Sequence, residues 1–228
     1  MTRLTVKTKA LVGEARWLPY VLPFGVFMLF TAPVEFFPSS APFLYVLKTV
    51  TVGILLWIFR HRYKSDLACC LSLFEVLVSV ALGLAVLIIW IKGDGLLPFV
   101  GKNSGFNPFA YAGSGLGAGL LIFFRLLGAA LVVPIMEELF WRAFLMRYLI
   151  NPHFDSVPMG TFTWFSFISV AVVFGLEHHR VVEGIIAGMI YGLIVVWQKR
   201  LTGAVIAHAT TNLGLGIYVL LTGSWQFW

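Results

Sequence analysis

The stretch Pro134-Ile-Met-Glu-Glu-Leu-Phe-Trp-Arg-Ala-Phe-Leu-Met-Arg147 places two adjacent acids and an arginine in sequence that is apolar enough for a lipid bilayer. An ionisable group inside a membrane costs at least ~2.5–3.5 kcal/mol, so such groups are usually paired, buried and functional. Glu138 and Arg142 are four residues apart, which on a helix puts them on one face and predicts a pair. Glu137 lies about 100° around the helix and has no basic residue four positions on. We therefore expect Glu137 to face other parts of the chain.

The composition around this stretch predicts a polytopic membrane protein. Of the 228 residues, 60% are hydrophobic and 11% are charged, whereas soluble domains average about 45–50% apolar and about 25% charged residues. This balance excludes disorder and a water-soluble core. The net charge of +6 arises from basic residues that fall mainly between apolar stretches, as membrane orientation requires. We therefore expect the lipid bilayer as a partner and no nucleic acid.

Seven apolar stretches predict an all-α membrane helix bundle with seven crossings. They cover residues 18–34, 41–59, 67–91, 116–150, 161–176, 181–197 and 201–221. The fourth would be about 52 Å long as one helix, which is too long for one simple crossing. Pro134 lacks a backbone donor and predicts a kink in it, which gives eight crossings if the proline separates two helices.

The domain organisation and orientation follow from the same pattern. No soluble domain or repeat is visible, so residues 1–228 are expected to form a single integral-membrane domain, with N-terminal spans and a loop in 1–115 and the motif-bearing core spans in 116–221. The loop around residues 92–114 is rich in Gly, Pro and Asn and is expected to dip toward the membrane. Basic residues alternate to one side, which predicts a cytoplasmic N-terminus in a bacterial inner membrane.

A strip of small residues marks the sixth apolar stretch. Gly184, Gly188 and Gly192 recur at intervals of four residues and therefore share one helix face. Such a strip allows a second helix to approach closely in lipid. We expect tight packing of this helix against a neighbour.

Three further polar residues suggest chemistry. His208 and Asn212 are four residues apart on one predicted helix face, where their donors could hold a developing oxyanion. Glu137 and His178 could bind a water molecule and deprotonate it. A water nucleophile is favoured because the sequence contains no nucleophile elbow or serine–histidine pairing. His179 is a rival beside His178.

Other interpretations stay open at this point. A divalent metal such as zinc is one alternative, with Glu137, His178 and His208 as ligands, because two histidines and a glutamate form a known catalytic set. No other cofactor is indicated. Buried acids and histidines also serve proton-coupled transporters, although these often show repeated halves. A non-catalytic membrane scaffold is the third alternative.

The ordered motifs resemble those of a known family. Glu137-Glu138-x-x-x-Arg142, Phe174-x-x-x-His178 and His208-x-x-x-Asn212 are similar to the motif set of the CAAX protease and bacteriocin-processing (CPBP, or Abi) family, which includes the type II CAAX prenyl endopeptidases. The resemblance covers about residues 116–221.

The resemblance implies an intramembrane, glutamate-dependent endopeptidase. Glu137 would activate water together with His178, His208 and Asn212 would line the oxyanion hole, and Glu138 with Arg142 would support the geometry. The substrate would be a membrane-associated protein or peptide, lipidated or carrying a C-terminal signal. Family members have also been labelled metalloproteases, which keeps the zinc alternative open.

The predicted depths of these residues conflict. Glu137 would lie about 18 Å from the cytoplasmic end of its span, His178 about 25 Å and His208 about 10 Å, at 1.5 Å per residue. They can meet only if spans are tilted, broken or shifted in depth. Either the boundaries are wrong or the fifth helix starts later than residue 161.

Overall fold

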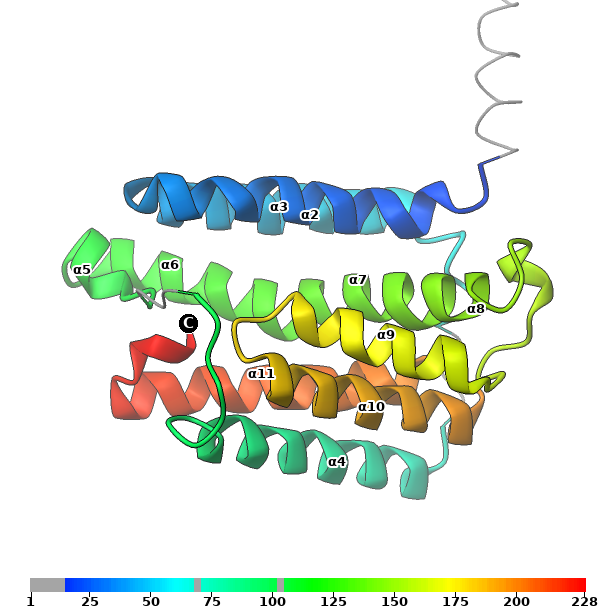
Figure 1. The fold of residues 1–228 in the computed structure, drawn as a ribbon. Helices are drawn as coiled ribbons and strands as arrows, with labels where there is room; N and C mark the ends of the chain where they lie inside the picture. The colour runs from blue at the N-terminus through cyan, green and yellow to red at the C-terminus, as the bar shows by residue number, and fades with distance from the viewer. Residues whose placement is uncertain (1–14, 68–70, 102–104) are drawn as a thin grey trace, which may run out of the picture.

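The computed structural model describes residues 15–67, 71–101 and 105–228, and this part of the chain contains helices and no strand. The predicted all-α bundle is therefore confirmed. Most of the helices run nearly parallel, with α2 and α3 along one side of the bundle and α4 along the other (Figure 1). The basic residues before position 15, which contributed to the predicted orientation, lie outside the described residues.

The helical elements of the described part follow one another with short connections. They are α2 (Leu18–Phe36), η1 (Pro38–Ser40), α3 (Ala41–Phe59), α4 (Leu73–Lys92), α5 (Pro108–Ala112), α6 (Leu116–Leu127), η2 (Gly128–Val132), α7 (Val133–Glu138), η3 (Leu139–Leu145), α8 (Met146–Tyr148), η4 (Phe154–Ser156), α9 (Trp164–Leu176), α10 (Val181–Gln198), α11 (Thr202–Thr222) and η5 (Trp225–Phe227).

The apolar helices match the predicted number of crossings. Within the described ranges, five helices are long and apolar enough to span a membrane, and two shorter apolar helices, Leu18–Val34 and Trp164–Leu176, complete the seven. The C-terminus lies at the opposite end of the bundle from the start of α2 (Figure 1). This arrangement is the one that an odd number of crossings produces.

At Pro134, where we expected a kink, the helix is continuous and has one π-helical segment before the proline and one after it. The segments α6, η2, α7, η3 and α8 form a single helix of 33 residues, Leu116–Tyr148, so the alternative of eight crossings is wrong. In η2, the Val133 N–H donates to the Gly128 carbonyl, five residues back. This π-helical bond lies directly before Pro134. The helix therefore continues through the proline, although the proline has no backbone N–H to donate.

Two predicted boundaries are wrong because capping residues start the helices later. Helix α4 begins at residue 73, where Ser72 and Glu75 form a capping box, and not at residue 67. Helix α9 begins at residue 164, since the Thr163 hydroxyl accepts a hydrogen bond from the Ser166 N–H.

The glycine strip of α10 packs against α9, as predicted. A Cβ added at Gly184 would come 2.9 Å from Cα of Gly175, and one added at Gly188 would come 3.1 Å from Cα of Ala171. Such separations leave no room for a side chain, so the two backbones are in contact.

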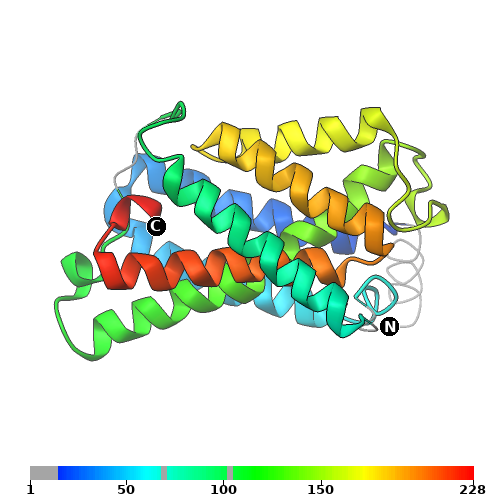
Figure 2. The same cartoon turned by 90° about the horizontal axis from the view of Figure 1, so that it is seen from below.

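The short helix α9 resolves the conflict in depth. Its 13 residues span only about 20 Å, and the turn between α9 and α10 therefore lies inside the length of the bundle, short of the ends of α6 and α11 (Figures 1 and 2). The late start of α9, which was one of the two predicted explanations, places His178 at an inner depth.

The loop after α4 covers this turn. The Val100 N–H donates to the His179 carbonyl at 2.9 Å, and His179 Nδ1 lies 2.8 Å from the Val100 carbonyl oxygen. Arg180 Nη2 donates to Asp94 Oδ1 at 2.7 Å. These contacts hold the loop against the inner turn.

Candidate functional site

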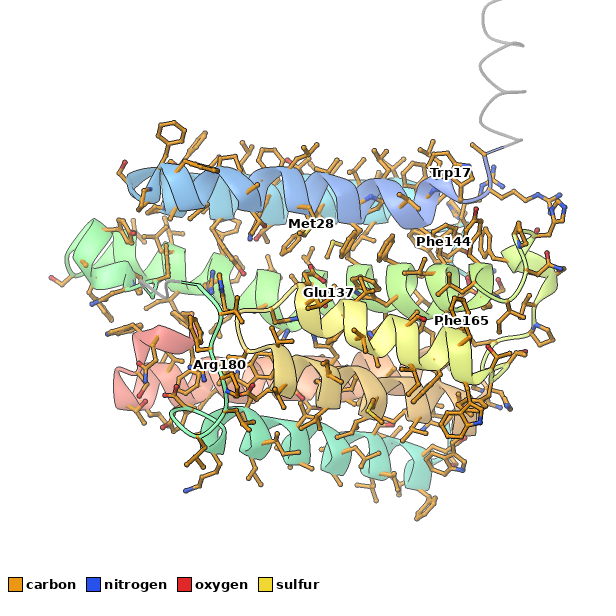
Figure 3. All side chains as sticks on the ribbon, viewed as in Figure 1. Trp17, Met28, Glu137, Phe144, Phe165 and Arg180 are labelled. Carbon is orange, nitrogen blue, oxygen red and sulfur yellow. The ribbon has the colours of Figure 1, made fainter. Side chains whose placement is uncertain are left out.

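A cavity of about 380 Å³ lies inside the bundle, and all four predicted reactive residues line it: Glu137, His178, His208 and Asn212. They come from the long helix, from the α9–α10 turn and from α11. Figure 3 shows Glu137 in the interior, near the middle of the bundle's length. Three segments that are distant in sequence therefore contribute to one site.

Glu138 and Arg142 form the pair that their spacing predicted. Arg142 Nη1 donates to Glu138 Oε1 at 2.9 Å, and both side chains are fully buried. Arg142 Nη2 also donates to the Gly188 carbonyl at 3.1 Å, and its guanidinium lies 4.5 Å from the centre of the Phe174 ring. The pair thus links the long helix to α10 and α9.

His208 lies between the two adjacent acids. Its Nδ1 is 3.0 Å from Glu138 Oε1, and its Nε2 is 3.9 Å from Glu137 Oε2. Since an ionised carboxylate only accepts, Nδ1 carries the proton that binds Glu138. The imidazole also stacks on Tyr191, with ring centres 4.9 Å apart and planes 19° from parallel. The orientation of His208 is therefore fixed on two sides.

Glu137 is buried and lacks the partners that its neighbour has. Its Oε2 is buried and makes no hydrogen bond within the described chain, and Glu137 is one of the residues that line the cavity. A buried carboxylate oxygen of this kind can accept a proton from a bound water molecule. The helical spacing in the sequence predicted the same difference, with Glu138 paired and Glu137 left without a partner on its own helix.

The ring of His178 is held by its own helix. Nδ1 lies 2.8 Å from the Phe174 carbonyl oxygen, four residues earlier, so this nitrogen is the donor. In the neutral ring the lone pair then resides on Nε2. Trp90 packs edge-on against the ring at 5.5 Å between centres. His179, the rival residue, is exposed and bonds the loop at Val100.

Asn212 bonds the π-helical turn beside Glu137. Its Nδ2 donates to the Ala129 carbonyl at 2.8 Å. The backbone cannot satisfy this carbonyl, because the Val133 N–H is given to Gly128 and Pro134 has no N–H. A side-chain amide has two N–H donors. One donor of Asn212 therefore remains for the predicted oxyanion role.

Four charged residues of the cavity were not assigned a role from the sequence: Lys48, Arg125, Glu177 and Arg180. Glu177 directly precedes His178, and its Oε2 is buried without a hydrogen-bond partner in the described part of the chain. Lys48 and Arg125 each stand inside an apolar stretch, which is itself the signal for a functional residue.

The zinc alternative does not fit the arrangement of the side chains. In residues 15–67, 71–101 and 105–228, no three His, Cys, Asp or Glu side chains are placed so that they could hold a metal ion.

Outside the membrane-spanning helices, Asp94 holds the loop to the turn. The hydrogen bond from Arg180 lowers the pKa of the Asp94 carboxyl below its ordinary value, and a weaker contribution comes from Gln226. The ionised form of Asp94 is therefore favoured in the folded protein.

Comparison with known families supports the resemblance. Residues 119–214 match the family model described as type II CAAX prenyl endopeptidase Rce1-like. This segment contains all six residues of the proposed site and support: Glu137, Glu138, Arg142, His178, His208 and Asn212. No curated protein and no solved structure matches the chain.

Proposed function

Residues 119–214 match the family model described as type II CAAX prenyl endopeptidase Rce1-like, a family of peptidases, and we propose that the chain is an intramembrane endopeptidase with Glu137 as its general base. One observation carries the proposal. Side chains from three separate segments, Glu137, His178, and His208 with Asn212, line one cavity within an apolar bundle. The substrate is a membrane-associated protein or peptide.

Water is activated between Glu137 and His178. A water molecule in the cavity donates one hydrogen to the free carboxylate of Glu137 and a second to Nε2 of His178, the ring nitrogen that is left unprotonated when Nδ1 bonds Phe174. Glu137 takes the proton as the water oxygen attacks the carbonyl carbon of the substrate. The carbonyl π electrons move to oxygen, which becomes the oxyanion.

His208 and Asn212 stabilise this oxyanion. Asn212 offers the N–H that Ala129 does not use, and His208 offers Nε2–H in the state in which both ring nitrogens are protonated. Donors fixed before the reaction lower the barrier because they need no reorganisation. Collapse of the tetrahedral intermediate breaks the C–N bond, and the proton held by Glu137 passes to the leaving amine.

Glu138 and Arg142 act as positioning residues. Glu138 accepts from both Arg142 and His208, and Arg142 is further held by Gly188 on α10. The imidazole therefore depends on the Glu138–Arg142 pair for its orientation.

The orientation in the membrane follows from the charges at one end of the bundle. Arg16, residues 60–64, Arg147 and residues 199–200 belong to connections or helix ends on the side where α2 begins (Figure 1). By the positive-inside rule this end faces the cytoplasm, here of a bacterial inner membrane. Exposed apolar side chains such as Leu29, Phe74 and Leu221 face the acyl chains.

The test compares membranes that contain wild-type protein with membranes that contain Glu137→Gln. After incubation in H₂¹⁸O, mass spectrometry of membrane peptides reads which new carboxyl termini carry ¹⁸O. We expect labelled termini with the wild-type protein and with Asp155→Asn, an acid-to-amide control in the α8–α9 connection, and none with Glu137→Gln. Labelling by a correctly folded Glu137→Gln variant would refute the role of Glu137.

A further inference from the structure

The cavity extends from Glu137 toward one end of the bundle and not toward the other. In the long helix its lining residues end with Glu137, and none of the residues 138–148 lines it. The lining residues of α2 lie at or after the midpoint of that helix, and those of α3, which runs back, lie in its first half. They are Phe27, Met28, Thr31, Tyr45 and Lys48. The cavity therefore occupies the half of the bundle in which α6 begins (Figure 1).

The cavity reaches the surface of the molecule at this end. Phe99 of the loop after α4, His179 of the α9–α10 turn and Gln226 of the C-terminal segment all line it, and all three are exposed. Gln226 Nε2 donates to Asp94 at 3.4 Å, so the C-terminal segment and the loop meet here. We call Phe99, His179 and Gln226 the mouth of the cavity.

The opposite end of the bundle is closed by packed aromatic rings. The ring centre of Tyr20 lies 5.5 Å from that of Tyr63 and 5.2 Å from that of Phe154, and Phe154 lies 5.1 Å from Phe144. All four side chains are buried, and none of them lines the cavity. Interiors packed in this way leave no passage for water or for a peptide.

Two cations indicate that the part of the cavity between Glu137 and the mouth is hydrated. Arg125 precedes Glu137 in the long helix by about 18 Å, at 1.5 Å per residue, and Lys48 lies within the apolar span Pro38–Phe59. In the described part of the chain neither side chain has an acid within ion-pair distance. A charge at membrane depth without an acid beside it is tolerated where it lines a water-filled cavity.

The charges at the two ends relate the mouth to the sides of the membrane. Arg16, residues 60–64, Arg147 and residues 199–200 lie at the closed end, which by the positive-inside rule faces the cytoplasm. The mouth lies at the other end of the bundle, where the C-terminus is placed (Figure 1). The hydrated part of the cavity is therefore directed away from the cytoplasm.

We propose that the site is reached from the extracytoplasmic side, so that both the water and the cleaved bond of the substrate come to Glu137 through the mouth. The inference rests on the proposed peptidase function and on the orientation given with it. It defines the substrate class by topology: membrane proteins whose cleaved bond has been translocated and lies in or beside the extracytoplasmic half of the bilayer. A segment that stays in the cytoplasm, lipidated or not, meets the closed end.

The first test measures from which side a water-soluble reagent enters the cavity. In a background in which Cys69 and Cys70 are replaced by Ser, single cysteines are placed at two cavity positions, Leu215→Cys and Thr31→Cys. The second of these is nearly isosteric, so it serves if the first does not fold. A membrane-impermeant methanethiosulfonate is added to right-side-out or to inside-out vesicles, and mass spectrometry measures the rate of modification.

Three control cysteines calibrate the result. Lys64→Cys and Ser114→Cys, both at exposed positions, mark the closed end and the end at which α6 begins. Leu213→Cys lies on α11 near the cavity position 215, but Leu213 is 45% exposed on the outer surface of the bundle and faces lipid. A thiol in hydrocarbon does not ionise, and only the thiolate reacts.

We expect both cavity cysteines to react at least about tenfold faster in right-side-out than in inside-out vesicles, because only the mouth admits water to the thiolate. Ser114→Cys should share this preference, Lys64→Cys should show the reverse, and Leu213→Cys should stay unmodified. Faster reaction of the cavity cysteines in inside-out vesicles, or no reaction from either side, would overturn the proposal. Marker cysteines with reversed sidedness would also overturn it, and so would modification of Leu213→Cys as fast as that of Leu215→Cys.

The second test uses the positions of the ¹⁸O-labelled carboxyl termini and separates this proposal from the peptidase assignment. Glu137-dependent termini should lie in translocated segments or in the extracytoplasmic half of a span. If they lie in cytoplasmic segments, the peptidase stands and the outward-facing site falls. If no terminus depends on Glu137 but the cavity cysteines react from outside, the peptidase assignment falls and the outward-facing cavity remains.

Discussion

Nδ1 of His208 lies 3.0 Å from Oε1 of Glu138, so the acid that neutralises the arginine of its own helix also fixes an imidazole on α11. The adjacent acid, Glu137, keeps an oxygen without a partner in the described structure. Two neighbouring glutamates of the same chemical type thus have different surroundings, and these surroundings separate a positioning acid from a reactive one.

The first prediction concerns the stability of variants at these two acids. Glu138→Ala leaves Arg142 buried and without its carboxylate, and such a loss costs ~3–5 kcal/mol in other buried pairs. Glu137→Ala removes a carboxylate with an unpartnered oxygen and should cost clearly less. Thermal unfolding in detergent, followed by tryptophan fluorescence, should rank Glu138→Ala as the less stable variant. The reverse ranking would contradict this division of roles.

The second prediction tests the bond from Asn212 to the π turn. Asn212→Leu leaves the Ala129 carbonyl without a donor, which should cost about 1–3 kcal/mol of unfolding free energy. Pro134→Ala supplies a backbone N–H five residues after Ala129, which can satisfy the carbonyl in the π register. The cost of Asn212→Leu should therefore be smaller in the Pro134→Ala background. Simple additivity in this double-mutant cycle would show that the two positions are not coupled.

The third prediction concerns the pH dependence of the loop that covers the inner turn. Because Arg180 lowers the pKa of Asp94 in the folded state, Asp94 contributes stability above its unfolded pKa of about 3.9, and this contribution is lost as the pH falls through the lower folded value. Limited proteolysis of the loop around Val100 should accelerate below about pH 4 in the wild-type protein. Asp94→Asn should be cleaved faster at neutral pH, with less additional acceleration in acid. Equal cleavage of the two proteins at pH 7 would contradict this role of the ion pair.

The sequence predicted the parts of the site that depend on spacing within one helix. The pairing of Glu138 with Arg142 and the separation of Glu137 follow from helical periodicity, because residues four apart share a face. The contact of His208 with Glu138 could not be predicted, since it depends on the depth of α11 relative to the long helix. Hydropathy predicts which segments span the membrane, but it does not predict how deep one span lies relative to another.

The depth of His178 was missed for a related reason. This depth depends on α9, a helix of only 13 residues that begins at its cap, Thr163. The first residue of a helix is set by local capping bonds, which hydropathy does not predict. The π turn before Pro134 was equally hidden, because a proline predicts a missing N–H and not the way in which the helix accommodates it. Lys48, by contrast, could have been singled out as a cation inside an apolar stretch.

The last prediction tests whether close packing of α9 on α10 holds the site together. A Cβ at Gly188 would meet backbone atoms of Ala171 at 3.1 Å, and these cannot turn aside as a side chain can. Gly188→Ala should therefore separate the two helices, weaken the bond from Arg142 to the Gly188 carbonyl, and cost about 1–3 kcal/mol.

The matched control is Gly25→Ala on α2, where an added Cβ meets no atom within 4 Å. This substitution should leave the unfolding temperature unchanged or raise it slightly, because alanine is the better helix former. Proteolytic activity should fall with Gly188→Ala and persist with Gly25→Ala, because only the first displaces the helices that carry His178 and bind Arg142. Full stability and activity of Gly188→Ala would show that the site tolerates a wider α9–α10 spacing.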